Sequence, residues 1–297
     1  MKRIVFPAMW LIALSVIFVS CNEDDHNEVP APEGMLTLDI DNLMKLESNE
    51  RYEGWIIVNG APVSTGTFMV DDMGKLSQST FKVDKMELSA ATDFVLSIEP
   101  HPDNDPAPSA IKILGGGFSG ASADITAAHG AALGDDFSSV AGKYILATPT
   151  TPETTDELSG VWFLDLASGS PATGLTLPTL PSGWVYEGWA VIDGQPVTTG
   201  TFTAADMKDN SAPFSGMGGP TFPGEDFVKN APAGLTFPTD LTGSTIVISI
   251  EPSPDNSPAP FVFKPLVGNV PTPAMDHKTY MMNDNVMGSF PKGSVMR

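Results

Sequence analysis

The chain has a single cysteine among its 297 residues, so no disulfide can form within it. It has 15 basic against 36 acidic residues, which gives a formal net charge of −21. A surface with so few positive charges repels a phosphate backbone, and we therefore expect no nucleic acid partner. Long apolar runs are also missing, except for one at the N-terminus that is shorter than the roughly 20 residues of a spanning helix.

The chain also lacks the residue patterns of common hydrolytic and metal centres. No G-x-S-x-G motif marks a nucleophilic serine. The histidines are scattered and lack metal-ligand spacing: His26, His101, His129 and His277. We therefore expect no catalytic residues, no bound metal and no cofactor, and we interpret the protein as non-enzymatic.

The N-terminus reads as a secretory signal that ends at the cysteine. A basic start precedes an apolar run, Ile4 to Val19, and Phe-Val-Ser leads directly into Cys21. A charged start followed by a short apolar run is typical of a signal peptide. The junction resembles a bacterial lipobox, which implies that Cys21 becomes the lipidated first residue of the mature protein.

The stretch that begins with the cysteine, residues 21–33, is acidic and contains proline, so it reads as a solvated tether. Glu23, Asp24 and Asp25 resemble the acidic export signal of surface-exposed lipoproteins in Bacteroidetes; a plain hydrophilic spacer is the alternative interpretation. We expect a protein anchored by lipid in the bacterial cell envelope, at the outer membrane, and surface-exposed if the export signal operates.

Two segments of the chain are written twice. Residues 52–73 and 186–207 share 13 of 22 positions, and both begin Tyr-Glu-Gly-Trp. Residues 95–108 and 247–260 share 11 of 14 positions, and both contain Ile-Glu-Pro. A period of more than 50 residues indicates two tandem domains, each with its own core, and not a solenoid of small repeats.

Each copy has the pattern of β-structure. Asn59-Gly60 and Asp193-Gly194 lie between β-rich flanks and tolerate the positive φ of a type I′ hairpin turn. Residues 94–99 and 246–251 alternate between apolar and other side chains with a period of two, and proline ends both runs. We predict an all-β protein of two tandem β-sandwich-like domains, with a partly helical segment at 121–133. The matched Trp55 and Trp189 are interpreted as core anchors.

The repeat and the polar stretches set the expected boundaries. These are a signal peptide at 1–20, a tether at 21–33, a first module at 34–150, a linker at 151–159, a second module at 160–284 and a C-terminal tail at 285–297. The second module is 18 residues longer between its two repeated segments. This insertion carries four phenylalanines, which we predict as a contact surface, against the alternative that they cover the core: Phe214, Phe222, Phe227 and Phe237.

The order of the motifs resembles a known domain. The Tyr-Glu-Gly-Trp strand, the Gly-x-Pro-Val-x-Thr-Gly-Thr-Phe strand and the Ile-Glu-Pro strand are similar to the extracytoplasmic C-terminal domain of anti-sigma-K factors, here present twice. The resemblance implies a β-sandwich and an envelope location, and it implies no catalytic residue. Such factors bind their sigma factor through a cytoplasmic region, which we expect a chain lipidated at Cys21 to lack.

These observations lead to one expected function and one alternative. We expect an envelope lipoprotein that acts as an interaction or structural module, with the membrane and an unknown envelope protein as partners. The alternative is an extracytoplasmic signalling component related to anti-sigma factors, which acts through a partner.

Two further patterns suggest ligand sites, and each also has a simpler interpretation. Gly115–Gly120 matches G-x-G-x-x-G but lacks the second strand of a dinucleotide site, and we interpret it as a flexible turn. The repeated Pro-Asp-Asn turns place acidic side chains near one loop, as calcium would require, although such residues are also ordinary in turns. The acidic residues in question are Glu99, Asp103 and Asp105 in the first copy and Glu251 and Asp255 in the second.

The lipobox resemblance predicts the effect of replacing the cysteine. The Cys21→Ser variant should incorporate no fatty-acid analogue and should stay unprocessed or leave the membrane fraction, because the acylated thiol is gone. Metabolic labelling followed by gel fluorescence measures this. Equal labelling of wild type and variant would contradict the lipoprotein interpretation.

Overall fold

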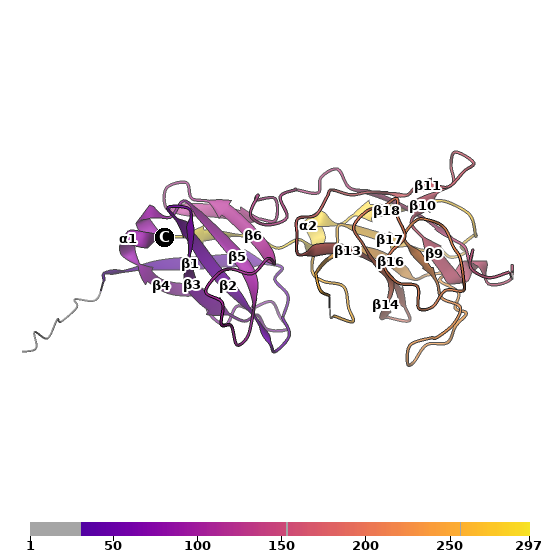
Figure 1. Cartoon of the computed structure of the whole chain (residues 1–297), viewed down its shortest axis with the longest axis horizontal. Helices are drawn as coiled ribbons and strands as arrows, with labels where there is room; N and C mark the ends of the chain where they lie inside the picture. Colours follow the sequence, from indigo (N-terminus) through magenta and orange to yellow (C-terminus); the bar gives the residue numbers. More distant parts are fainter. Residues whose placement is uncertain (1–30, 153, 256) are drawn as a thin grey trace, which may run out of the picture. The chain divides into compact units, whose positions relative to one another are not determined.

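The computed structural model describes residues 31–152, 154–255 and 257–297. From Pro32 onward these residues belong to one compact unit. Two large antiparallel sheets, each nearly barrel-like, make up the fold (Figure 1), and the expected all-β class with two domains is confirmed.

The first sheet has the strand order β3-β2-β5-β6-β7-β19-β1-β4. Its strands are β1 (Glu33–Asp41), β2 (Glu50–Val58), β3 (Ala61–Phe68), β4 (Thr80–Asp84), β5 (Asp93–Pro100), β6 (Lys112–Gly117), β7 (Ser122–Thr126) and β19 (Lys292–Met296). Helix α1 (Lys85–Ala90) follows β4, and the carboxylate of Asp84 caps it by accepting hydrogen bonds from two backbone amides.

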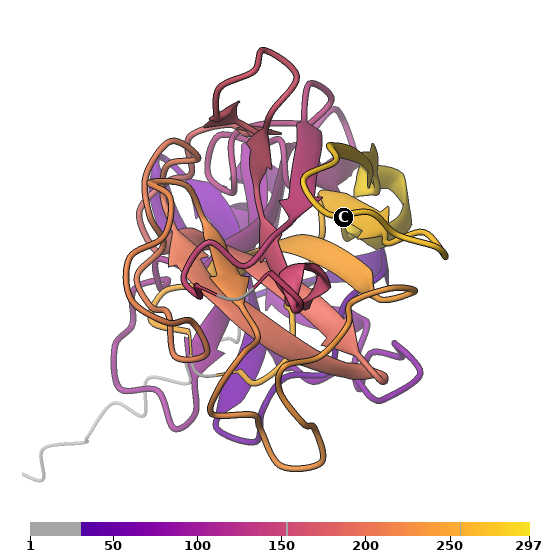
Figure 2. The same cartoon turned by 90° about the vertical axis from the view of Figure 1, so that its right-hand side faces the viewer.

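The second sheet has the strand order β14-β13-β16-β17-β18-β8-β9-β15, and β12 pairs with β8 beside this path. Its strands are β8 (Ala141–Leu146), β9 (Gly160–Trp162), β12 (Leu175–Thr176), β13 (Trp184–Ile192), β14 (Gln195–Phe202), β15 (Gly224–Asp226), β16 (Thr245–Pro252), β17 (Leu266–Asn269) and β18 (Tyr280–Asp284). The remaining elements are the pair β10 (Leu164–Asp165) and β11 (Ala172–Thr173), the 3-10 helix η1 (Glu157–Ser159) and helix α2 (Val286–Ser289). Figure 2 turns the view so that the side bearing this sheet faces the reader.

The two repeated hairpins have the predicted geometry. Asn59 and Gly60 both have positive φ, and so do Asp193 and Gly194, as a type I′ turn requires. Each hairpin also has a register shift just before its tryptophan, between Gly54 and Trp55 in the first copy and at the equivalent place in the second. The register of the duplicated strands is therefore the same in both copies.

The two sheets exchange strands. β8, which lies before the linker and was expected in the first module, pairs with β18, β9 and β12 of the second sheet. β19, which lies in the expected C-terminal tail, pairs with β1 on one side and β7 on the other. In Figure 1 the yellow end of the chain accordingly runs into the indigo and magenta sheet. Strand pairing thus crosses the expected boundaries at two places. In the first sheet, the edges of β1 and β7 accept β19, a strand that is remote from both in sequence.

The two connecting segments meet at an aromatic contact. Phe137 precedes β8, Phe290 precedes β19, and their rings pack edge to face with centroids 5.2 Å apart. Phe290 also packs on Phe263, with ring centroids 4.8 Å apart. Phe137 and Phe263 are fully buried, so one apolar cluster continues from the first sheet to the second.

Several local expectations were wrong. Residues 121–133, expected as partly helical, contain the strand β7, because pairing with β19 and β6 outweighs the helix propensity of their alanines. Gly115 to Gly117, expected in a flexible turn, belong to β6. A Cβ on Gly116 would lie 2.0 Å from the Asp124 carbonyl oxygen, so glycine allows a close strand approach there.

The exchange predicts that the last six residues stabilise the first sheet. Val295 in β19 is fully buried, and the Arg297 guanidinium donates hydrogen bonds of 2.7 Å to the carbonyl oxygens of Leu88 and Ala91. Deleting residues 292–297 should destabilise this sheet by at least about 2 kcal/mol, because an apolar side chain and two strand pairings are lost. Hydrogen exchange should then accelerate in β1 and β7 and change little in β13 and β16.

Replacing Met296 by Ala provides the control for this deletion, because the Met296 side chain is half exposed while its backbone still pairs. Unchanged exchange in β1 and β7 after the deletion would show that β19 does not hold the sheet together.

Candidate functional site

The repeated Ile-Glu-Pro strand has a buried polar face. In β5, Phe94, Leu96 and Ile98 belong to the main apolar cluster. Ser97 and Glu99 alternate with them on the opposite face and are nevertheless only 0% and 2% exposed. In β16, Ser249 and Glu251 are both fully buried. A buried carboxyl group is costly unless it is paired, so this face is the natural candidate for a site.

The matched tryptophans lie on the same face. The Trp55 Nε1 atom donates a 2.8 Å hydrogen bond to the Ser97 hydroxyl oxygen, and Trp189 donates an equal bond to Ser249. Both indole rings are buried, as the core interpretation predicts. Neither ring belongs to the main apolar cluster; both lie on the opposite face, beside the serine of the neighbouring strand.

A second glutamate reaches this face from the Tyr-Glu-Gly-Trp strand. Glu53 accepts a short hydrogen bond from the Ser64 hydroxyl, and Glu187 accepts one from the Thr198 hydroxyl. Glu187 is only 4% exposed. Its Oε1 atom accepts this bond, whereas its Oε2 atom is buried and meets no hydrogen-bond donor in the part of the chain that the structure describes.

The loop after each Ile-Glu-Pro strand is fastened to the strand's glutamate. The Phe261 amide donates hydrogen bonds of 2.9 Å and 3.1 Å to the two carboxylate oxygens of Glu251. The Ser109 amide does the same to Glu99. In the second copy this brings Asp255 to the cluster, where its Oδ1 atom also accepts a 2.8 Å bond from the Ser257 amide.

Three carboxyl groups converge in the second copy. Oxygen atoms of Glu187, Glu251 and Asp255 all lie within 4.8 Å of one another, and no other described residues form such a group of possible metal ligands. Burial raises the pKa of Glu187 to about 8, and a side-chain hydrogen bond with Asp255 and the negative charges of Asp255 and Glu251 act in the same direction. Burial also raises the pKa of Glu251 to about 7, against the hydrogen bonds from Ser249 and Phe261.

The sequence located part of this cluster. The repeated Pro-Asp-Asn turns pointed to Glu251 and Asp255 as possible ligands, and the structure brings these two together. They gave no indication of Glu187. Glu187 lies on the strand opposite Ser249, a register that the sequence does not disclose. The repeated Tyr-Glu-Gly-Trp was the available signal, because a glutamate next to a buried tyrosine in a strand must lie on the strand's other face.

The predicted contact phenylalanines are engaged within the fold. The rings of Phe214, Phe227 and Phe237 pack against one another with centroids 5.5 to 6.0 Å apart, and Phe227 is fully buried. Phe222 is half-buried against a small cluster around Trp162. The rings thus cover the core, and their role as a binding surface stays a prediction. The lipidation site Cys21 lies outside the described residues.

The insertion also builds a second buried acidic group. The Asp226 carboxylate accepts hydrogen bonds from Trp162 Nε1 at 2.7 Å and from the Thr150 amide at 2.9 Å. Glu225 is fully buried, and its Oε1 atom accepts a short bond from the Ser215 hydroxyl. Burial raises the pKa of Glu225 to about 7, and the charges of Asp209 and Asp226 add to this effect.

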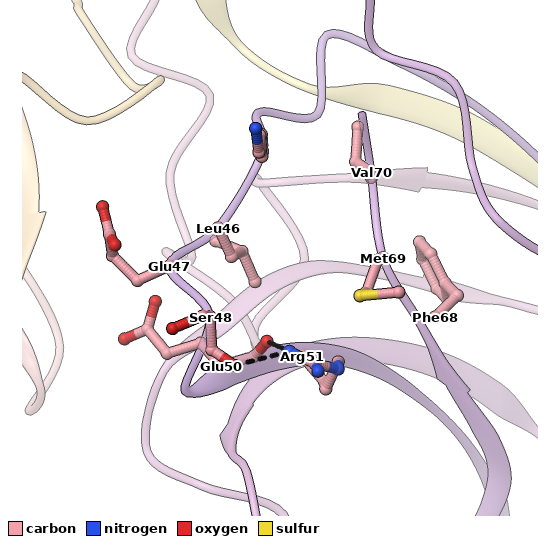
Figure 3. A pocket seen from close by; sticks show the side chains of 9 residues that line it. Leu46, Glu47, Ser48, Glu50, Arg51, Phe68, Met69 and Val70 are labelled. Carbon is pink, nitrogen blue, oxygen red and sulfur yellow. Dashed lines mark hydrogen bonds between the residues drawn. The ribbon is translucent and has the colours of Figure 1, made fainter. Parts of the chain in front are cut away.

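A cavity of about 560 Å³ lies beside β2 and β3. Figure 3 shows Arg51 in its wall, where the guanidinium donates hydrogen bonds of 3.0 Å and 2.5 Å to the carbonyl oxygens of Ser48 and Glu50. Lys45, also in the wall, is paired with Asp72 over 2.9 Å. Because both cations are already engaged, this cavity is a weaker candidate than the carboxyl cluster.

Comparisons with known proteins place the chain in no family, so the protein is classified here by its fold alone. No family model, no curated protein and no solved structure matches the chain. Among the helices described between residues 31 and 297, with 153 and 256 left out, none has the length and apolarity to cross a membrane. The class defined so far is an all-β protein of two domains with a buried carboxyl cluster, and the anti-sigma-K resemblance stays a prediction.

The acidic group in the insertion predicts a pH dependence of stability. Between about pH 4.5, where an unfolded glutamate titrates, and pH 7, Glu225 holds its proton in the folded protein and releases it in the unfolded one. Stability should therefore fall as pH rises through this window. In the Glu225→Gln variant, the unfolding free energy should fall between about pH 5 and pH 8 by about 1–3 kcal/mol less than in the wild type. Urea unfolding at several pH values measures this.

The exposed Glu47 offers the matched control, since Glu47→Gln removes the same charge from the surface. If the unfolding free energy of Glu225→Gln depends on pH as in the wild type and in Glu47→Gln, the buried carboxyl group does not titrate as described.

Proposed function

We propose that this protein is a lipid-anchored, non-enzymatic component of the bacterial cell envelope, in which two β domains act as an interaction or structural module. The observation that carries the proposal is the exchange of β8 and β19 between the sheets. The signal-like N-terminus, the lipobox and the resemblance to an extracytoplasmic domain support the location.

The exchange ties the domains together twice. The chain passes from the first sheet to the second between β7 and β8, and it returns between β18 and β19. A chain of simple tandem domains has one such connection. Here two segments cross between the sheets, so a rotation of one domain against the other must bend both.

The geometry of β1 and β19 also suits a protein held at its N-terminus. The tether joins β1 at Glu33, and β19 enters the sheet at Lys292, opposite Asp41 at the other end of β1. A pull between the anchor and the second domain would shear the two strands along their length. The ladder hydrogen bonds of an antiparallel pair are perpendicular to the strands, so such a pull loads them together and not one after another.

Crosslinking in intact cells tests the proposal. With the full chain at its native level, a membrane-impermeant crosslinker should yield a discrete adduct with an envelope protein. The Cys21→Ser variant should lose that adduct, since it no longer resides at the membrane. An adduct with a membrane-spanning protein would favour the signalling alternative, whereas recovery in the cytoplasmic fraction without an envelope adduct would overturn the proposal.

A further inference from the structure

In the carboxyl cluster of the second copy, one buried carboxylate oxygen meets no hydrogen-bond donor and lies against a second carboxyl group. The Glu187 side chain is only 4% exposed, and its Oε2 atom has no hydrogen-bond donor among the described residues. It belongs to the cluster in which Glu251 and Asp255 place oxygens within 4.8 Å. A buried carboxylate oxygen without a donor, beside two other carboxyl groups, needs either a shared proton or a bound cation.

The protein itself supplies little positive charge here. Lys264 is the basic group whose charge acts on Glu251, and burial lowers the pKa of its ammonium group. Thr198 is the donor that Glu187 has. A metal ion binds the ionised form of a carboxyl group. With all three groups ionised beside one lysine, two negative charges are uncompensated, which matches the charge of a divalent cation.

We propose that Glu187, Glu251 and Asp255 bind a divalent cation that prefers oxygen ligands, and that Ca²⁺ is the ion the site fits best. Ca²⁺ takes six to eight oxygen ligands in flexible geometry, and carboxylates are its usual protein ligands. Mg²⁺ demands a stricter octahedral arrangement and is commonly held by only one or two carboxylates, so three converging carboxylates favour the larger ion.

The site is held firmly on two sides and is open to solvent. Glu187 and Glu251 stand on the paired strands β13 and β16, and Asp255 comes from the loop that the Phe261 amide fastens to Glu251. A polar cavity of about 440 Å³ borders Glu187 and Asp255. Another of about 360 Å³ borders Glu251 and Asp255. These cavities give an ion a path inward and leave room for the waters that complete its coordination.

The first copy provides an internal comparison. Its equivalent residues are Glu53, Glu99 and Asp103, but no described group there brings three ligand atoms within 4.8 Å. Glu53 is 9% exposed, against 4% for Glu187, and neither of its oxygens is among the described buried atoms that lack a partner. We therefore expect one cation per chain, bound by the second copy. This inference does not depend on the proposed envelope function.

Calorimetric titration of the metal-stripped full chain in detergent tests the site. Ca²⁺ should bind with one ion per chain and a Kd of about 10⁻⁴ to 10⁻³ M, as in extracellular modules, and Mg²⁺ should bind more weakly. A saturating amount of Ca²⁺ should raise the melting temperature by about 2–5 °C. Glu187→Gln should weaken binding at least tenfold and abolish this rise, while Glu53→Gln, the matched change in the first copy, should leave both intact.

Asp255→Asn is the second variant if Glu187→Gln fails to fold, because Asp255 is only half-buried on a loop. Tb³⁺ is the second probe, since the buried Trp189 on the same face can sensitise its luminescence and Ca²⁺ should quench that signal by competition. The proposal is overturned if wild type shows neither heat nor a melting shift with Ca²⁺, as expected when a shared proton stabilises the carboxyls. It is equally overturned if Glu187→Gln and Asp255→Asn bind Ca²⁺ like wild type.

Discussion

The backbone pairing of β19 between β1 and β7 is the interaction on which the rest of the structure depends. It completes the first sheet with the last residues of the chain. The residues of the second domain therefore lie, in sequence, between β7 and β19 of the first sheet. Because Phe137 and Phe290 pack where the connecting segments meet, the apolar core is continuous across the exchange. A strand pair that is far apart in sequence is costly to close, yet it couples the two domains once formed.

The two copies share their backbone features but differ in the carboxyl groups that they bring together. Both copies keep the hairpin turn, the register shift before the tryptophan and the bond from tryptophan to serine. They differ in the loop and in the insertion, and only the second copy gathers three carboxyl groups in the described residues. A matched pair of sites within one chain means that each test on Glu187 has a control at Glu53 under the same conditions.

Local features were well predicted, and remote ones were not. The Asn-Gly and Asp-Gly turns, the period of two in the Ile-Glu-Pro strands and their ends at proline depend on neighbouring residues, so the sequence discloses them. The helix expected at 121–133 failed because a partner strand from the C-terminus decides the conformation of β7. Two of the three cluster residues were predicted: Glu251 at the end of β16 and Asp255 in the loop that follows are close in sequence, whereas Glu187 arrives through strand register.

The sequence by itself determined the duplication, the all-β class, the turn positions and the acidic loop, because each is recorded in residue identity or short-range pattern. Only the tertiary structure decided which sheet receives β8 and β19, and which side chains share the buried face of β13 and β16. The physical reason is that backbone amides and carbonyls pair without regard to sequence identity. Which strands pair depends on which apolar side chains become buried when they do. The pairing of β13 with β16 places Glu187 beside Glu251.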